Sequence, residues 1–241
     1  MAGEFLGVIH TIFDILAAAA SLGVTAFCYR WRLRDAAQRI EYAGAGYVLA
    51  LVAGAAIGGY GLGSLNMVLS GQPMVARSIV GALAGAIAAI EVFKWARGLK
   101  GSTGLIFVPA FATTVVAGRW GCFLSGLEDE THGTPTLLPW GVDLGDGILR
   151  HPVQLYESFT MAAFLAVALA LIGKRNPWFM HNGFYALVLF YAGQRFLWEF
   201  FKPYGAIIGP FNLFHLVCGA LAIYALVMMR GNKGNHERTS P

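Results

Sequence analysis

The sequence predicts an all-α, polytopic integral membrane protein with about seven transmembrane helices. Hydrophobic residues make up 57% of the 241-residue chain and charged residues only 12%, whereas a soluble domain carries about a quarter charged residues. The charges stand in short clusters, and the apolar runs between them reach the roughly 18 residues that a helix needs to cross the hydrocarbon core. Membrane strands would instead be short segments of alternating polarity, so a single helical bundle is expected.

The apolar runs place seven expected helices of membrane-spanning length. They cover residues 4–29, 43–69, 78–97, 104–124, 153–173, 182–202 and 209–229. They predict one transmembrane helical domain over residues 1–230, followed by a disordered, polar cytoplasmic tail at 231–241. The first run has an acidic start and is followed by arginines, which favours an uncleaved helix over a signal peptide.

The distribution of basic residues predicts the orientation of the helices. Twelve of the seventeen Lys and Arg residues fall on one side of the expected helices, and five fall on the other. Because cytoplasmic loops are rich in Lys and Arg, the N-terminus is expected outside and the C-terminus in the cytoplasm. The net charge of +4 follows this topology and forms no single stripe, which argues against a nucleic-acid partner.

Glycines recur at four-residue spacing in two neighbouring expected helices. The pairs are Gly54 with Gly58 and Gly59 with Gly63 in the second helix, and Gly81 with Gly85 in the third. Such spacing lets two helix backbones approach closely. The alternative is that glycine is simply common in membrane helices.

Two arginines interrupt apolar runs in the outer half of the expected bundle. An arginine at the centre of a membrane helix costs about 2.5–3.5 kcal/mol on insertion scales, so Arg119 and Arg195 are expected to face the interior and mark a functional site. The alternative is that they extend toward the outer headgroups. Tyr191 and Glu199 flank Arg195 at four-residue intervals on one helix stripe, where a purely structural Arg–Glu pair is also possible.

A long connection, residues 125–152, joins the fourth and fifth expected helices and ends in a polar run. Connections of this length are functional or disordered, and the Pro, Gly and Trp content favours an ordered lid or arm on the outer face. Pro152 suits the first turn of a helix. The polar run around Pro152 consists of His151, Gln154, Tyr156 and Glu157.

Further polar residues are expected in the same outer half. His10 and Asp14 stand four apart on the first helix, where a carboxylate can orient an imidazole that acts as a base; a satisfied polar pair is the alternative. Arg77 precedes the third helix. Because converging arginines hold phosphate bidentately, the sequence predicts a periplasmic site for an anionic phospholipid headgroup.

Three ordered motifs resemble the prolipoprotein diacylglyceryl transferase family. Gly118 to Ser125 is similar to its Gly-Arg-x-Gly-Asn-Phe signature, and His151 to Glu157 is similar to its His-Pro-x-Gln-Leu-Tyr-Glu run. Tyr191 to Lys202 resembles its Arg-Phe-x-x-Glu-Phe-Phe-Arg motif. The resemblance extends from about residue 78 to 229 and agrees with seven spans and an outward N-terminus.

The resemblance implies a reaction, its partners and a location. Family members move the diacylglyceryl group of phosphatidylglycerol to a lipobox cysteine thiol of a preprolipoprotein, and glycerol phosphate leaves. Arg119 and Arg195 match the family's essential arginines, which would hold the lipid phosphate and stabilise its charge. From the polar pattern and the resemblance together, the residues expected to contact substrate are Asp14, Arg77, Gly121, His151, Gln154, Tyr156, Glu157, Tyr191 and Glu199; Asp14 and Arg77 have no counterpart in the family motifs. No metal or organic cofactor is expected, and the site would face the periplasmic leaflet of the bacterial inner membrane.

Two departures from the family pattern leave a second interpretation open. Val80 stands where the family has a histidine tied to activity, and Cys122 stands where it has an asparagine. In a catalytic protein, His10 oriented by Asp14 would replace the missing base. The alternative is a non-catalytic or repurposed relative that binds anionic phospholipid or modifies a different acceptor.

Overall fold

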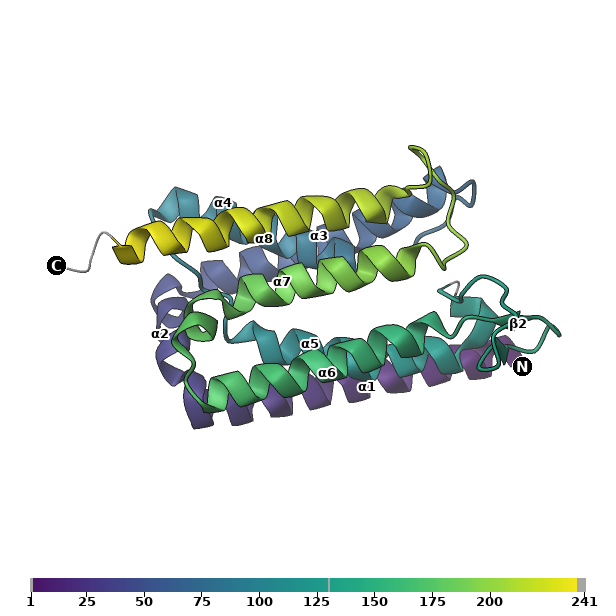
Figure 1. The fold of residues 1–241 in the computed structure, drawn as a ribbon, viewed down its shortest axis with the longest axis horizontal. Coiled ribbons are helices and arrows are strands. Elements are labelled where there is room, and N and C mark those ends of the chain that lie inside the picture. Colours follow the sequence, from purple (N-terminus) through teal and green to yellow (C-terminus); the bar gives the residue numbers. More distant parts are fainter. Residues whose placement is uncertain (1, 130, 238–241) are drawn as a thin grey trace. The chain divides into compact units, whose positions relative to one another are not determined.

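In the computed structural model the chain is mostly helical, and the structure describes residues 2–129 and 131–237 (Figure 1). The elements in chain order are α1 (Ala2–Cys28), the π-helical turn η1 (Tyr29–Leu33), α2 (Arg34–Ala43), α3 (Ala45–Leu69), α4 (Ile79–Arg97), α5 (Phe107–Leu124), the 3-10 turn η2 (Gly126–Asp129), β1 (Val142–Asp143), β2 (Leu149–Arg150), α6 (Val153–Gly173), α7 (Pro177–Glu199) and α8 (Leu213–Glu237). Within the described residues, six helical stretches are long and apolar enough to cross a membrane. The prediction of an all-α, polytopic membrane protein is confirmed.

Each of the seven expected stretches contains a long helix, and three differences from the expected pattern stand out. α7 is not among the six apolar stretches, because Asn182, Gln194 and Arg195 lower its hydropathy. A short charged helix, α2, occupies the expected loop after the first span. α8 continues to Glu237, past the expected end at 229. The single domain over 1–230 and the disordered tail over 231–241 stay predictions.

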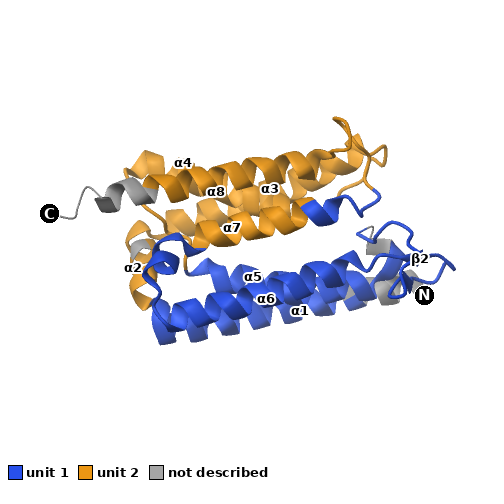
Figure 2. Ribbon diagram, in the orientation of Figure 1, with its two compact units in different colours: residues 1–33, 106–183, 197–203 blue, residues 34–105, 184–196, 204–241 orange. Residues whose placement is uncertain are grey.

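The chain divides into two compact units (Figure 2). Unit 1 comprises residues 1–33, 106–183 and 197–203, and unit 2 comprises residues 34–105, 184–196 and 204–241. In unit 1, α5 packs against both α1 and α6. In unit 2, α3 packs against α4, and α8 contacts both.

Several helices begin and end where the sequence supplies a capping residue. Ser78 accepts a hydrogen bond from the Gly81 amide at the start of α4, and Asn176 accepts one from the Phe179 amide at the start of α7, just before Pro177. These caps satisfy amides that have no partner within the helix. At the end of α4, Gly98 adopts φ 64°, a left-handed conformation that glycine reaches without strain.

The glycines of α3 and α4 permit direct backbone contact between the two helices. A Cβ atom added at Gly58 would strike the Gly81 carbonyl oxygen, and one added at Gly85 would strike the Gly54 carbonyl oxygen. The Ser78 amide also donates to the Gly59 carbonyl at 3.0 Å. The expectation of close approach through these glycines is confirmed.

Replacing Gly58 by alanine tests this contact, because the new methyl group would meet backbone atoms that have no rotamer to move into. We expect Gly58→Ala to destabilise the protein by about 1–3 kcal/mol, the usual cost of overpacking. Gly61→Ala on the same helix is the matched control, since its Cβ would meet nothing within 4 Å. The measurement is the denaturation midpoint in detergent, and equal midpoints for the two variants would contradict the packing described.

Candidate functional site

One end of unit 1 brings together three of the segments that the sequence singled out. α5 carries Arg119 near its C-terminal end, and α6 carries Gln154, Tyr156 and Glu157 in its first turns. Residues 197–203, at the end of α7 and just beyond it, belong to the same unit. The Ser158 hydroxyl donates to the Val116 carbonyl at 2.8 Å, which fixes the start of α6 against the last turns of α5.

The carboxylate of Glu157 binds two cations inside this unit. Its Oε2 lies 2.5 Å from Nε of Arg119, and its Oε1 lies 2.8 Å from Nζ of Lys202. The Glu157 and Lys202 side chains are 0% exposed, and that of Arg119 is 5% exposed. Arg119 therefore faces the interior of unit 1, as its position within an apolar run predicted. We call Arg119, Glu157 and Lys202 the ion cluster.

Arg119 also contacts Cys122, three residues further along α5. Its Nη1 donates to Sγ of Cys122 at 3.9 Å. A guanidinium carries five N–H donors in a planar fork, so one side chain can hold a carboxylate through Nε and an anion through its terminal nitrogens. Gly121 is buried beside it, and its carbonyl accepts the Ser125 amide at 2.9 Å.

A second network joins His151 and Tyr156 to the long connection. The Tyr156 hydroxyl accepts a hydrogen bond from Nε1 of Trp140 at 2.8 Å, and it lies 3.5 Å from Nδ1 of His151. The His151 ring centre is 4.8 Å from that of Phe201, and the Tyr156 ring centre is 5.2 Å from that of Trp198. These contacts fix the polar run at the start of α6 against the segment that carries Lys202.

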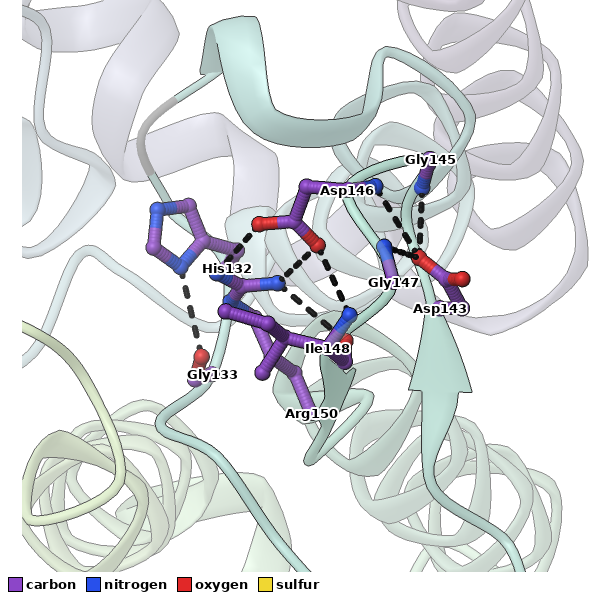
Figure 3. Close-up of polar contacts among 8 residues, drawn as sticks. All are labelled: His132, Gly133, Asp143, Gly145, Asp146, Gly147, Ile148 and Arg150. Carbon is purple, nitrogen blue, oxygen red and sulfur yellow. Dashed lines mark hydrogen bonds and ion pairs between the residues drawn. The ribbon is translucent and has the colours of Figure 1, made fainter.

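The described part of the connection 125–152 contains a short hairpin (Figure 3). β1 and β2 pair antiparallel, with Val142 opposite Arg150. Oδ1 of Asp143 accepts hydrogen bonds from the amides of residues 145, 146 and 147, at 2.8, 3.1 and 3.0 Å. Arg150 holds both oxygens of Asp146, at 2.6 and 2.7 Å. This hydrogen bonding holds the pKa of Asp146 below its ordinary value.

Unit 2 contains Tyr191 and Arg195, on the C-terminal half of α7. Tyr191 is 0% exposed and Arg195 is 4% exposed. The Arg195 guanidinium lies 5.6 Å from the ring centre of Phe214, and the ring centres of Phe196 and His215 are 4.9 Å apart. Arg195 is thus buried against α8. Glu199 follows on the same helix at the expected spacing and is 1% exposed.

Three other predicted site residues lie elsewhere. The side chain of His10 is outside the described residues, although its backbone belongs to α1. Asp14 is on an exposed face of α1, and Arg77 is exposed on the connection between α3 and α4. Gln154 is buried at the start of α6, where Nε2 lies 3.5 Å from Oγ1 of Thr131.

The structure adds residues to the site that the sequence reasoning passed over. The sequence places Lys202 at the end of an expected span and predicts no role for it. The basic residue that closes the late-helix motif was nevertheless a signal for a role of Lys202 in the site. Asn212 and His215 cap α8 reciprocally, with Asn212 Oδ1 accepting the His215 amide and His215 Nδ1 accepting the Asn212 amide. No sequence pattern indicated that Trp140 would reach Tyr156.

The lowered pKa of Asp146 predicts acid sensitivity of the hairpin. A carboxyl group whose pKa is depressed on folding stabilises the fold above its unfolded pKa, and this contribution is lost as pH falls through the folded pKa. We expect pepsin to cleave the connection faster in Asp146→Asn than in the unmodified chain at mildly acidic pH. The ratio of the two rates should approach one as Asp146 becomes protonated, and a ratio independent of pH would contradict this contribution.

Comparison with known proteins identifies the family of the chain. The sequence model of the family described as prolipoprotein diacylglyceryl transferase matches residues 15–230. Three similar proteins are named phosphatidylglycerol–prolipoprotein diacylglyceryl transferase. The one from Geobacter sulfurreducens is 34% identical over 51% of this chain and 48% of its own length. The one from Wolinella succinogenes is 37% identical over 47% and 41%, and the one from Campylobacter lari is 41% identical over 36% and 30%.

The matched region spans about half the length of these curated relatives, or less. The family model matches a longer part of the chain, residues 15–230. This part includes all of the motifs quoted above and the ion cluster. On this match, the chain is a membrane protein that belongs to the prolipoprotein diacylglyceryl transferase family.

Proposed function

We propose that this protein transfers the diacylglyceryl group of phosphatidylglycerol to the cysteine thiol of a prolipoprotein. In this reaction the thiol sulfur forms a bond to the glycerol carbon of the diacylglyceryl group. The bond between that carbon and the phosphate oxygen breaks, and its electron pair leaves on glycerol phosphate. The thiol gives up its proton, so no oxidant, reductant or other co-reactant is needed.

The observation that carries this proposal is the position of Arg119. It stands in the Gly118–Ser125 motif, inside an apolar helix, and it is held by a carboxylate that is 0% exposed. Guanidinium groups that are fixed in place before the reaction stabilise charge as it develops on a leaving phosphate. Glu157 orients Arg119 in this proposal, and Lys202 balances the second oxygen of Glu157.

Arg195 is the second proposed phosphate ligand. It is buried against the Phe214 ring in unit 2, where an aromatic face favours a cation and restricts its motion. We propose that Arg119 and Arg195 each contribute to binding the phosphate of the anionic lipid. Tyr191, Glu199 and the polar run from His151 to Glu157 are proposed to position these groups and the substrate.

In this proposal the thiol proton goes to a group other than the histidine that the resemblance implies for family members. The resemblance matches that histidine to Val80, which is 1% exposed in α4 and has no titratable atom. We propose that His10 accepts the proton and that Asp14, one turn further along α1, orients it. The proposed setting is the periplasmic leaflet of the bacterial inner membrane, based on the distribution of Lys and Arg between the two sides.

Conservative substitutions of the two arginines test the proposed phosphate contacts. Lysine keeps the charge but loses the planar fork that binds phosphate bidentately. We expect Arg119→Lys and Arg195→Lys each to lower kcat about 10²–10³-fold, the usual effect of removing one donor to a developing oxyanion. The measurement is transfer from labelled phosphatidylglycerol to a lipobox peptide in proteoliposomes, with Arg97→Lys, an exposed arginine at the end of α4, as the control.

Two results would contradict the proposal. Absence of transfer by the unmodified chain, combined with failure to replace the transferase in a strain depleted of its own, would overturn the reaction. Full activity of both arginine variants would overturn their role in binding the phosphate.

A further inference from the structure

The hairpin end of unit 1 exposes an apolar patch that the proposed reaction does not use. The patch consists of Leu137 (102% exposed), Trp140 (56%), Leu149 (47%), Ile148 (43%) and Leu138 (38%). We call these five residues the hairpin patch. They come from two segments of the connection, which are close in space because the Thr136 amide donates to the Leu149 carbonyl.

The hairpin patch lies on the chain just before α6, one of the helices long and apolar enough to cross a membrane. β2 ends at Arg150, and α6 starts three residues later at Val153. The Trp140–Tyr156 hydrogen bond of 2.8 Å ties the patch to the first turn of α6. Exposed apolar side chains also reach this end of the unit, since Trp120 and Leu124 on α5 and Phe159 on α6 are 37%, 44% and 61% exposed. Tryptophan and tyrosine are enriched at the membrane–water interface in membrane proteins.

Several charged and backbone groups of the hairpin are hydrogen-bonded within it, which lowers the cost of bringing them into lipid. Asp146 and Arg150 neutralise each other, and one Asp143 oxygen accepts three successive backbone amides (Figure 3). β2 pairs with β1, and the backbone of Arg150 also forms an isolated β-bridge with that of Pro135. Backbone groups that enter hydrocarbon must already be hydrogen-bonded. A peptide that extends a sheet, in contrast, needs an edge with open backbone groups.

We propose that the hairpin patch inserts into the headgroup and upper acyl region of the leaflet next to the start of α6. The occupant of the patch is the lipid surface itself. Insertion removes the apolar side chains of the patch from water, which favours it. It also holds Trp140, and through it Tyr156 and the residue after it, Glu157, at a fixed depth relative to the phospholipid headgroups. This inference concerns the location of the hairpin and does not depend on the proposed transfer reaction.

Collision accessibility of a nitroxide spin label tests the proposal. The label is attached at Leu137→Cys in proteoliposomes, after the three native cysteines are replaced by alanine, and it is compared with the same label at Gln72→Cys. Gln72 is a polar, exposed position on the connection between α3 and α4. Molecular oxygen concentrates in the bilayer and a charged nickel chelate stays in water. We expect the ratio of oxygen to nickel accessibility to be about tenfold higher at 137, because the remaining apolar side chains of the patch favour a position among the acyl chains.

Two outcomes would overturn the proposal. An equal ratio at positions 137 and 72 would place the patch in water. Low accessibility to both reagents at 137 would mean that protein covers the patch. The covering protein would be a lipobox peptide if the low accessibility appears only when that peptide is added, and a second copy of the chain otherwise. A label at Leu149→Cys repeats the test at a second position of the patch, so that a folding defect at one position does not decide the result.

Discussion

The carboxylate of Glu157 is the ion-pair partner of two buried cations, Arg119 and Lys202. Moving a charged side chain out of water costs several kcal/mol per ion, even after the protein relaxes around it. Here the carboxylate contacts Arg119 on one oxygen and Lys202 on the other, and neither Glu157 nor Lys202 has exposed side-chain surface. Removing the carboxylate would leave two buried cations without this partner. The arrangement of α5, α6 and the segment 197–203 therefore depends on one side chain.

The surrounding contacts follow from that arrangement. Ser158 fixes α6 to α5, and the His151–Phe201 and Tyr156–Trp198 ring contacts join the start of α6 to the segment that contributes Lys202. Because these contacts flank Glu157 on the chain, they restrict the direction in which its carboxylate points. Arg119 is thereby oriented before any ligand binds, which is how a fixed donor contributes most to stabilising a leaving phosphate. Cys122, which accepts a contact from Arg119, changes the neighbourhood of the ion cluster without removing it.

The sequence predicted the helices and the buried arginines because both can be recognised from the composition of a short stretch of chain. An apolar run of about 20 residues has few alternatives to a membrane helix, and Arg119 was identified by its insertion cost. Lys202 was missed because its partner Glu157 lies 45 positions earlier, and a lysine near a helix end is ordinarily explained by its headgroup contact. Trp140 was missed for a similar reason, since its hydrogen bond to Tyr156 depends on how a hairpin without strong periodicity folds back on α6.

A double-mutant cycle between Glu157 and Lys202 measures the coupling within the ion cluster most directly. The free energy of unfolding is measured in mixed micelles for Glu157→Gln, Lys202→Met and the double variant. If the two side chains are paired and buried, the double variant loses less stability than the sum of the single variants, by about 1–3 kcal/mol. Losses that add to within about 0.5 kcal/mol would show that the two side chains do not interact and would contradict the site described.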